Sequence, residues 1–279
     1  MRTGSDRETQ VTAAHLMTRG TPRRLDYRFL GAGPVERWWR PVQDWVVLEQ
    51  PEVIVCGRSL LISGIPSVRR DAIGTAIRYT LVVDDVERAL ARSLAAAGLN
   101  RAGRARLGGL LDAGFPADWV DATLGDTAPS DADVAHRLAP ALAAFGEDAP
   151  AVAHHPVRHR SWVGALDDGE AVAAFLDRVT RLADGEPGWA FTTSAIASVK
   201  GAGDAADALG APVAVLLADG GPMEVVDLGK AQAGPPRPGI RTMTATPNPS
   251  RRRWLVPLAG LVLLVAVLAV VLITMVIPL

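Results

Sequence analysis

The C-terminal stretch from Trp254 to Leu279 constrains this chain most, because it carries no charged side chain over about 26 residues. As an α-helix it would be about 39 Å long at about 1.5 Å per residue, and the hydrocarbon core of a bilayer is about 30 Å thick. Pro257 falls in the first turn, where its missing N–H costs least. A buried core helix is the alternative, but a core helix of this length would keep a polar edge. The stretch therefore predicts one transmembrane helix over residues 254–279.

Three arginines, Arg251, Arg252 and Arg253, come directly before this stretch, and Trp254 stands where an interfacial aromatic residue would. Positively charged flanks stay on the cytoplasmic side of a membrane. The N-terminus has charge but no apolar core region, so it does not resemble a secretory signal. We therefore expect a tail-anchored, single-pass protein of the cell membrane, with the lipid bilayer as a partner and the N-terminal domain in the cytoplasm.

Two polar segments frame the remaining chain. Residues 231–253 contain five prolines, small polar residues and the basic flank, which predicts an extended linker. Pro235, Pro236 and Pro238 could also be bound by a proline-reading module, although a plain spacer explains them without a partner. At the other end, residues 1–24 predict a poorly ordered arm.

The middle of the chain, residues 25–230, is expected to form a mixed α/β or α+β domain whose first part is rich in strands. Short apolar runs with β-branched residues, separated by glycine and proline, predict these strands. They are expected at 25–31, 44–49, 52–56, 59–63 and 75–83, with a glycine-bounded loop at 64–74. Short connections favour antiparallel pairing.

The second part of this domain is expected to be helical and then to end in a β-α-β unit. Apolar residues at helical spacing and capping residues predict the helices. Helices are expected from Asp84 or Asp85 to Gly98, as two short pieces within 107–124, from Ser130 with a bend at Pro140, and over 168–184. Strands at 189–197 and 212–217 flank a helix at 202–209, and residues 223–228 would return as a hairpin. One domain is favoured over two, because the last strands are too few for a sheet of their own.

Composition excludes some classes of partner. The chain has 29 basic and 30 acidic residues, so no net field attracts nucleic acid. Its basic residues are nearly all arginine, which is typical of a GC-rich bacterial genome. Cys56 is the single cysteine, so no intrachain disulfide can form, which fits a reducing compartment.

The most notable polar cluster in the strand-rich part is Arg69, Arg70 and Asp71, within the expected loop at 64–74. Arginine binds phosphate and carboxylate groups in a bidentate manner, so these residues are candidates for an anionic ligand site. Arg58 and Arg78 are close in sequence. The alternative is that these charges only face solvent.

Two other patterns are weaker. Residues 201–206 match G-x-G-x-x-A after an expected strand, with Asp219 at a distance that suits a ribose-binding acid, but a plain glycine-rich turn explains them as well. His154, His155 and His159 cluster in a segment with Pro156 and two arginines, which disfavours a helical metal site, so no metal is predicted.

The remaining candidates favour structural roles. Cys56 is expected to be a small buried residue, and Ser63 and Ser194 lack the context of a hydrolase nucleophile. Trp38 and Trp39 could form an exposed binding surface or pack in the core.

Three hypotheses about function follow from these patterns. The favoured one is a tail-anchored membrane protein that presents a cytoplasmic interaction or regulatory domain to a protein partner. The alternative is a membrane-tethered enzyme or sensor of a small anionic ligand, and the third is an effector that disturbs the membrane. No catalytic motif and no cofactor is predicted, so the sequence favours a non-enzyme.

Overall fold

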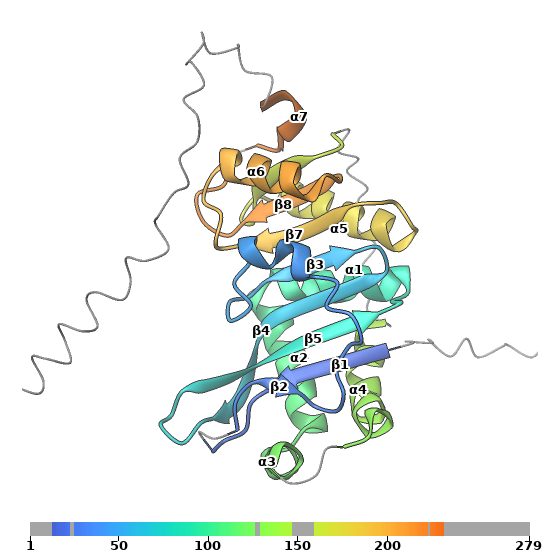
Figure 1. Cartoon of the computed structure of the whole chain (residues 1–279), viewed down its shortest axis with the longest axis vertical. Helices are drawn as coiled ribbons and strands as arrows, with labels where there is room; N and C mark the ends of the chain where they lie inside the picture. The colour runs from blue at the N-terminus through green and yellow to red at the C-terminus, as the bar shows by residue number, and fades with distance from the viewer. Residues whose placement is uncertain (1–12, 23–24, 126–128, 147–158, 223, 232–279) are drawn as a thin grey trace, which may run out of the picture. The chain divides into compact units, whose positions relative to one another are not determined.

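The computed structural model describes residues 13–22, 25–125, 129–146, 159–222 and 224–231 (Figure 1). All of them belong to one compact unit. The expected transmembrane helix at 254–279 and nearly all of the linker lie outside the described residues. Within the described ranges, no helix is long and apolar enough to cross a membrane.

Nine strands of the described chain form one mixed sheet in the order β2-β1-β5-β4-β3-β7-β8-β6-β9. The strands are β1 (Ala13–Thr18), β2 (Arg28–Phe29), β3 (Val53–Cys56), β4 (Ser59–Arg70), β5 (Ala76–Asp84), β6 (Trp162–Ala165), β7 (Trp189–Thr193), β8 (Val213–Leu217) and β9 (Val226–Asp227). In this sheet β6, β8 and β7 pair in parallel, and the other pairs are antiparallel. The large sheet and its helices confirm the mixed α/β class.

Helices cover both faces of this sheet. One face packs against α1 (Arg88–Leu99), α2 (Arg101–Gly114), α4 (Asp131–Gly146) and α5 (Gly169–Ala183), with α3 (Ala117–Gly125) beside α2 and α4. The other face packs against the 3₁₀-helix η1 (Arg40–Trp45), α6 (Val199–Leu209) and α7 (Leu228–Ala231). Each face therefore has its own apolar core, as expected for a sheet buried on both sides.

The first strand lies in the segment for which the sequence predicts a poorly ordered arm. β1 pairs with β5 from Ala13 to Met17, and Leu16 is fully buried in the core on the face covered by α1, α2, α4 and α5. The alternation of apolar residues in this segment is short, so only pairing with a distant strand stabilises it. The arm prediction for residues 1–24 therefore does not hold for 13–18.

The strand-rich part differs from the expectation in two further places. β4 continues through the expected loop at 64–74, because Gly64 and Pro66 sit at irregularities in the pairing with β5 instead of ending the strand. Gly64 has φ +64°, and a Cβ there would lie 2.6 Å from the backbone of Gln50, so only glycine fits. The expected strand at 44–49 is instead the end of η1 and a loop, with Val42 and Val46 packed on the second core.

The helices follow the sequence in order, but α2 begins at Arg101 and not at 107, and α6 begins at Val199 and not at 202. α5 spans nearly the expected range, with the Asp168 side chain accepting a hydrogen bond from Glu170 N–H. α2 and α3 are separated at Gly114 and Pro116, as expected. At the C-terminal end, the last strands join the N-terminal sheet through the β3–β7 pair, but β9 pairs with β6 and not with β8.

Candidate functional site

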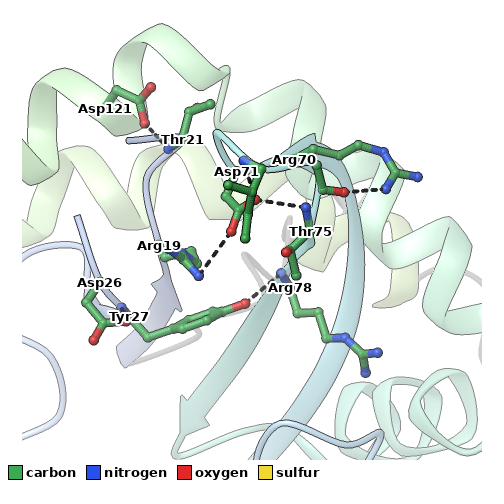
Figure 2. Close-up of polar contacts among 11 residues, drawn as sticks. Arg19, Thr21, Asp26, Tyr27, Arg70, Asp71, Thr75, Arg78 and Asp121 are labelled. Carbon is green, nitrogen blue, oxygen red and sulfur yellow. Dashed lines mark hydrogen bonds and ion pairs between the residues drawn. The ribbon is translucent and has the colours of Figure 1, made fainter. Parts of the chain in front are cut away.

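The three predicted anion-site residues lie where β4 turns into β5. Figure 2 shows that Arg70 and Asp71 point in different directions, and Arg69 is buried. Successive residues of a strand face opposite sides of a sheet, so Arg69 and Arg70 cannot share one ligand from a regular strand. We call residues 67–76 the hairpin tip. It lies next to the β1–β2 connection, since Ala72 N–H donates to Thr21 O at 3.0 Å.

Arg69 points into the protein and is 7% exposed. Its Nη2 donates to Thr18 Oγ1 at 2.6 Å, its Nη1 donates to Arg19 O at 3.1 Å, and its Nε donates to Ser67 Oγ at 3.3 Å. The guanidinium also lies 5.0 Å from the centroid of the Tyr79 ring. These contacts use donors on all three guanidinium nitrogens, so Arg69 connects the hairpin to β1.

Asp71 holds the turn between the two strands (Figure 2). Its Oδ1 accepts hydrogen bonds from Ile73 N–H at 3.0 Å and Thr75 N–H at 2.8 Å, and its Oδ2 lies 3.5 Å from Arg19 Nη1. Burial acts to raise the pKa of this carboxyl, but the two N–H donors and the Arg19 charge outweigh it and hold the pKa below its usual value. Asp71 is therefore an ionised turn residue.

Arg70 is the predicted residue that faces solvent. Its Nη1 donates to Gly74 O at 2.8 Å across the turn, and its side chain points away from Asp71 and Arg19 (Figure 2). The structure thus brings Arg19, not Arg70, to the Asp71 carboxylate. The anionic ligand site at Arg69, Arg70 and Asp71 stays a prediction, and Arg70 is the member of the set exposed to a ligand.

A second carboxylate, Asp112 of α2, fixes the other side of the hairpin tip. It accepts hydrogen bonds from Ser67 Oγ, from Val68 N–H at 2.8 Å and from Tyr79 Oη at 3.0 Å. The pKa of Tyr79 is raised to about 12, mainly by burial and also by the neighbouring Asp112 charge, although the Arg69 charge opposes the shift. The hairpin tip is therefore fixed from both sides by carboxylates.

Glu52 forms a separate buried polar network where η1 and β3 meet the end of β7. The residue is 1% exposed. Its carboxylate accepts hydrogen bonds from Ser194 N–H at 3.0 Å, Ser194 Oγ at 2.9 Å and Thr192 Oγ1 at 3.0 Å. Thr192 Oγ1 in turn accepts from Val53 N–H at 2.8 Å. The network joins the antiparallel and the parallel parts of the sheet.

This network predicts a stability that depends on pH. Burial raises the pKa of the Glu52 carboxyl above its usual value of 4.5, and the hydrogen bonds from Ser194, Thr192 and Val47 lower it only in part. The folded state therefore binds more protons than the unfolded state above pH 4.5, so the free energy of unfolding falls as the pH rises through the raised pKa. A carboxyl pKa that is one pH unit higher in the folded state changes this free energy by about 1.4 kcal/mol.

Urea unfolding of the protein and of its Glu52→Gln variant, at pH values from below to above 4.5, measures this change in the free energy of unfolding. The amide does not titrate, so the wild type should lose stability relative to Glu52→Gln as the pH rises above 4.5. A difference between the two proteins that stays constant with pH would exclude Glu52 as the titrating group.

The other predicted motifs occupy structural positions. Gly201 and Gly203 lie inside the first turns of α6 and not in a loop before it, so the glycines do not form a phosphate-binding turn. His159 Nδ1 lies 3.0 Å from Asp227 Oδ2, while His154 and His155 lie outside the described residues. Burial raises the pKa of the Cys56 thiol, which disfavours the reactive thiolate.

Trp38 and Trp39 divide between the two roles considered from the sequence. Trp39 is 5% exposed and belongs to the second core, and Trp38 is half-buried on top of it, with ring centroids 5.6 Å apart. Trp38 also borders a shallow recess of about 700 Å³ formed by residues 34–38, 40 and 41. A second recess, of about 690 Å³, lies between α2, α3 and α4 beside Trp119 and Arg137.

The sequence missed Asp112 and Glu52 as organising residues. Asp112 sits in an ordinary amphipathic helix, and Glu52 precedes an apolar run (VIVC) that predicts a buried strand. A carboxylate directly at the start of such a strand is the one signal that could have indicated a buried network. Among the residues that the structure describes, no group of three or more His, Cys, Asp and Glu side chains is placed to hold a metal ion.

Comparison of the whole chain with known protein families, with characterised proteins and with solved structures finds no match.

Proposed function

We propose that this chain is a tail-anchored membrane protein whose folded domain binds a protein partner in the cytoplasm through the hairpin tip. The sequence supports the anchor, with an uncharged stretch at 254–279 preceded by Arg251–Arg253. A linker of about 22 residues would have a mean reach of roughly 25 Å, which keeps the domain close to the bilayer.

The observation that carries the docking proposal is the exposure of two apolar side chains on a fixed backbone. Val68 is 81% exposed and Ile73 is 62% exposed, on either side of the turn held by Asp71. Single exposed apolar residues are common on protein surfaces. Here the Asp112 bond to Val68 N–H and the Asp71 bond to Ile73 N–H fix both residues, which lowers the entropy lost when a partner binds.

The position of the hairpin tip in the sheet favours a protein partner over the bilayer. The linker starts after α7, beside β9 at one edge of the sheet. Five strands separate β9 from β5, so the two strands lie roughly 29 Å apart at about 4.8 Å per strand. The hairpin tip therefore lies near the sheet edge opposite the attachment of the linker (Figure 1).

The chemistry of the hairpin tip describes the partner. Val68 and Ile73 would enter apolar recesses, and the exposed Arg70 guanidinium would meet a carboxylate at the rim of the partner surface. The partner is thus a protein with an apolar recess and an acidic rim.

A photocrosslinking residue placed at Val68 or Ile73 of the full-length protein, in its own membrane, tests this proposal. We expect one discrete protein adduct from both positions, and a decrease of at least about tenfold in this adduct when Arg70→Glu is added. Ala143 of α4 is the control, because it is exposed but lies outside the hairpin tip. The same adducts from all three positions, or no discrete adduct from the tip, would reject the docking surface.

A further inference from the structure

We infer that the surface formed by residues 34–38, 40 and 41, here called the Trp38 surface, contacts the anionic lipid headgroups of the membrane and orients the domain. The inference rests on the proposed tail anchor, which brings the domain to a bilayer. It assigns a role to a part of the molecule distinct from the hairpin tip.

The Trp38 surface combines apolar and cationic groups in the manner of an interfacial site. Val35 is fully exposed, and Pro41, Arg37 and Arg40 are exposed beside the half-buried Trp38. The indole N–H of Trp38 is buried and has no acceptor among the described residues, so Trp38 offers the exposed part of its apolar ring, and aromatic rings are enriched at the headgroup level of a bilayer. Within the surface, the exposed arginines Arg37 and Arg40 outnumber the acid Glu36, and these two arginines are the groups that would attract anionic headgroups, while the exposed acids Asp44 and Asp204 lie elsewhere on the same face.

The Trp38 surface is held rigidly on the body of the domain. The Trp38 ring packs edge-on against Trp39, and it lies 6.4 Å from the Trp189 ring of β7. Trp39 is buried in the second core, and η1 begins directly after it at Arg40. A membrane contact here would therefore fix the orientation of the whole sheet.

The Trp38 surface lies on the same face of the sheet as α7, after which the linker begins. η1 contacts α6, and α6 contacts α7, after which the linker begins. All three helices cover the same face of the sheet. Contact of this face with the bilayer leaves the hairpin tip, at the far edge of the sheet, accessible from the cytoplasm.

Fluorescence quenching in vesicles tests the inference with the full-length protein. An environment-sensitive probe is attached at Val35→Cys in a Cys56→Ser background, and vesicles contain nitroxide-labelled lipid with or without phosphatidylserine. The same probe at Val68→Cys is the matched control, since Val68 is also exposed and apolar. We expect strong quenching at position 35 only, and only with phosphatidylserine present. In the double variant Arg37→Glu, Arg40→Glu, the equilibrium constant for contact between the Trp38 surface and the bilayer should fall about thirtyfold or more, because the attraction of two arginines to the headgroups is lost.

The outcomes separate this inference from the proposed function. Protein that stays in vesicles after an alkaline wash but shows equal quenching at positions 35 and 68 overturns the membrane contact and leaves the anchor intact. Protection of position 35 without quenching by lipid would show that a protein segment covers the surface, which also overturns it. Protein that washes off the vesicles contradicts the tail anchor and the inference that depends on it.

Discussion

The Gly108→Ala variant is expected to be less stable than the wild type, and the Gly109→Ala variant is expected to be more stable. Both glycines lie in the middle of α2, but Gly108 is buried and Gly109 is exposed. A Cβ at Gly108 would collide with the carbonyl oxygen of Pro66 in β4, whereas a Cβ at Gly109 meets nothing within 4 Å. The obstacle at Gly108 is backbone, so it cannot move without shifting the strand.

The two substitutions are chemically identical, so their difference isolates the contact of α2 with β4. We expect Gly108→Ala to lower the free energy of unfolding by about 2–3 kcal/mol through overpacking. Gly109→Ala should raise it by up to about 1 kcal/mol, since alanine is the better helix former. Thermal and urea unfolding of both variants measure this, and equal effects would mean that α2 does not approach β4 at Gly108.

Replacing Asp112 by alanine is expected to have the second large effect. The variant loses the hydrogen bonds from Ser67 Oγ, Val68 N–H and Tyr79 Oη, and it leaves the fully buried Tyr79 hydroxyl without this acceptor. Hydrogen bonds to a charged group contribute about 1.5–3 kcal/mol, so we expect a loss of about 2–4 kcal/mol in the free energy of unfolding. Hydrogen exchange of the Val68 amide should become faster, because its acceptor is removed.

A double-mutant cycle with Tyr79→Phe supplies the control. Phenylalanine removes the hydroxyl that Asp112 satisfies, so the double variant should lose less stability than the sum of the single variants. The pKa of Tyr79, about 12 in the wild type, should fall in Asp112→Ala because a nearby negative charge is gone. Ultraviolet titration follows this directly, and an unchanged titration with additive losses would exclude the Asp112–Tyr79 bond.

The sequence predicts those elements whose signals are local. α5 has apolar residues at i, i+3, i+4 and i+7 and an acidic cap, and it forms within one residue of the expected range at each end. β4 shows the opposite case, because Gly64 and Pro66 indicate the start of a loop. β4 nevertheless continues to Arg70, because it pairs with β5 and packs closely against Gln50 and Pro51. Neither contact has a local sequence signal.

The arrangement at the hairpin tip was only partly accessible from the sequence. Arg69, Arg70 and Asp71 form a recognisable polar cluster, but adjacency along the chain does not give the direction of each side chain. The residues that decide those directions are Thr18 and Arg19, about fifty positions earlier, and they bind the guanidinium of Arg69 and the carboxylate of Asp71. Such long-range partners are set by the fold of the whole sheet.

The two ends of the sheet have a consequence for how copies of this protein meet. β2 and β9, the outermost strands, are each two residues long. An edge this short offers few free N–H and C=O groups, so a neighbouring chain gains little by adding a strand to it. This works against the edge-to-edge pairing of copies into fibres.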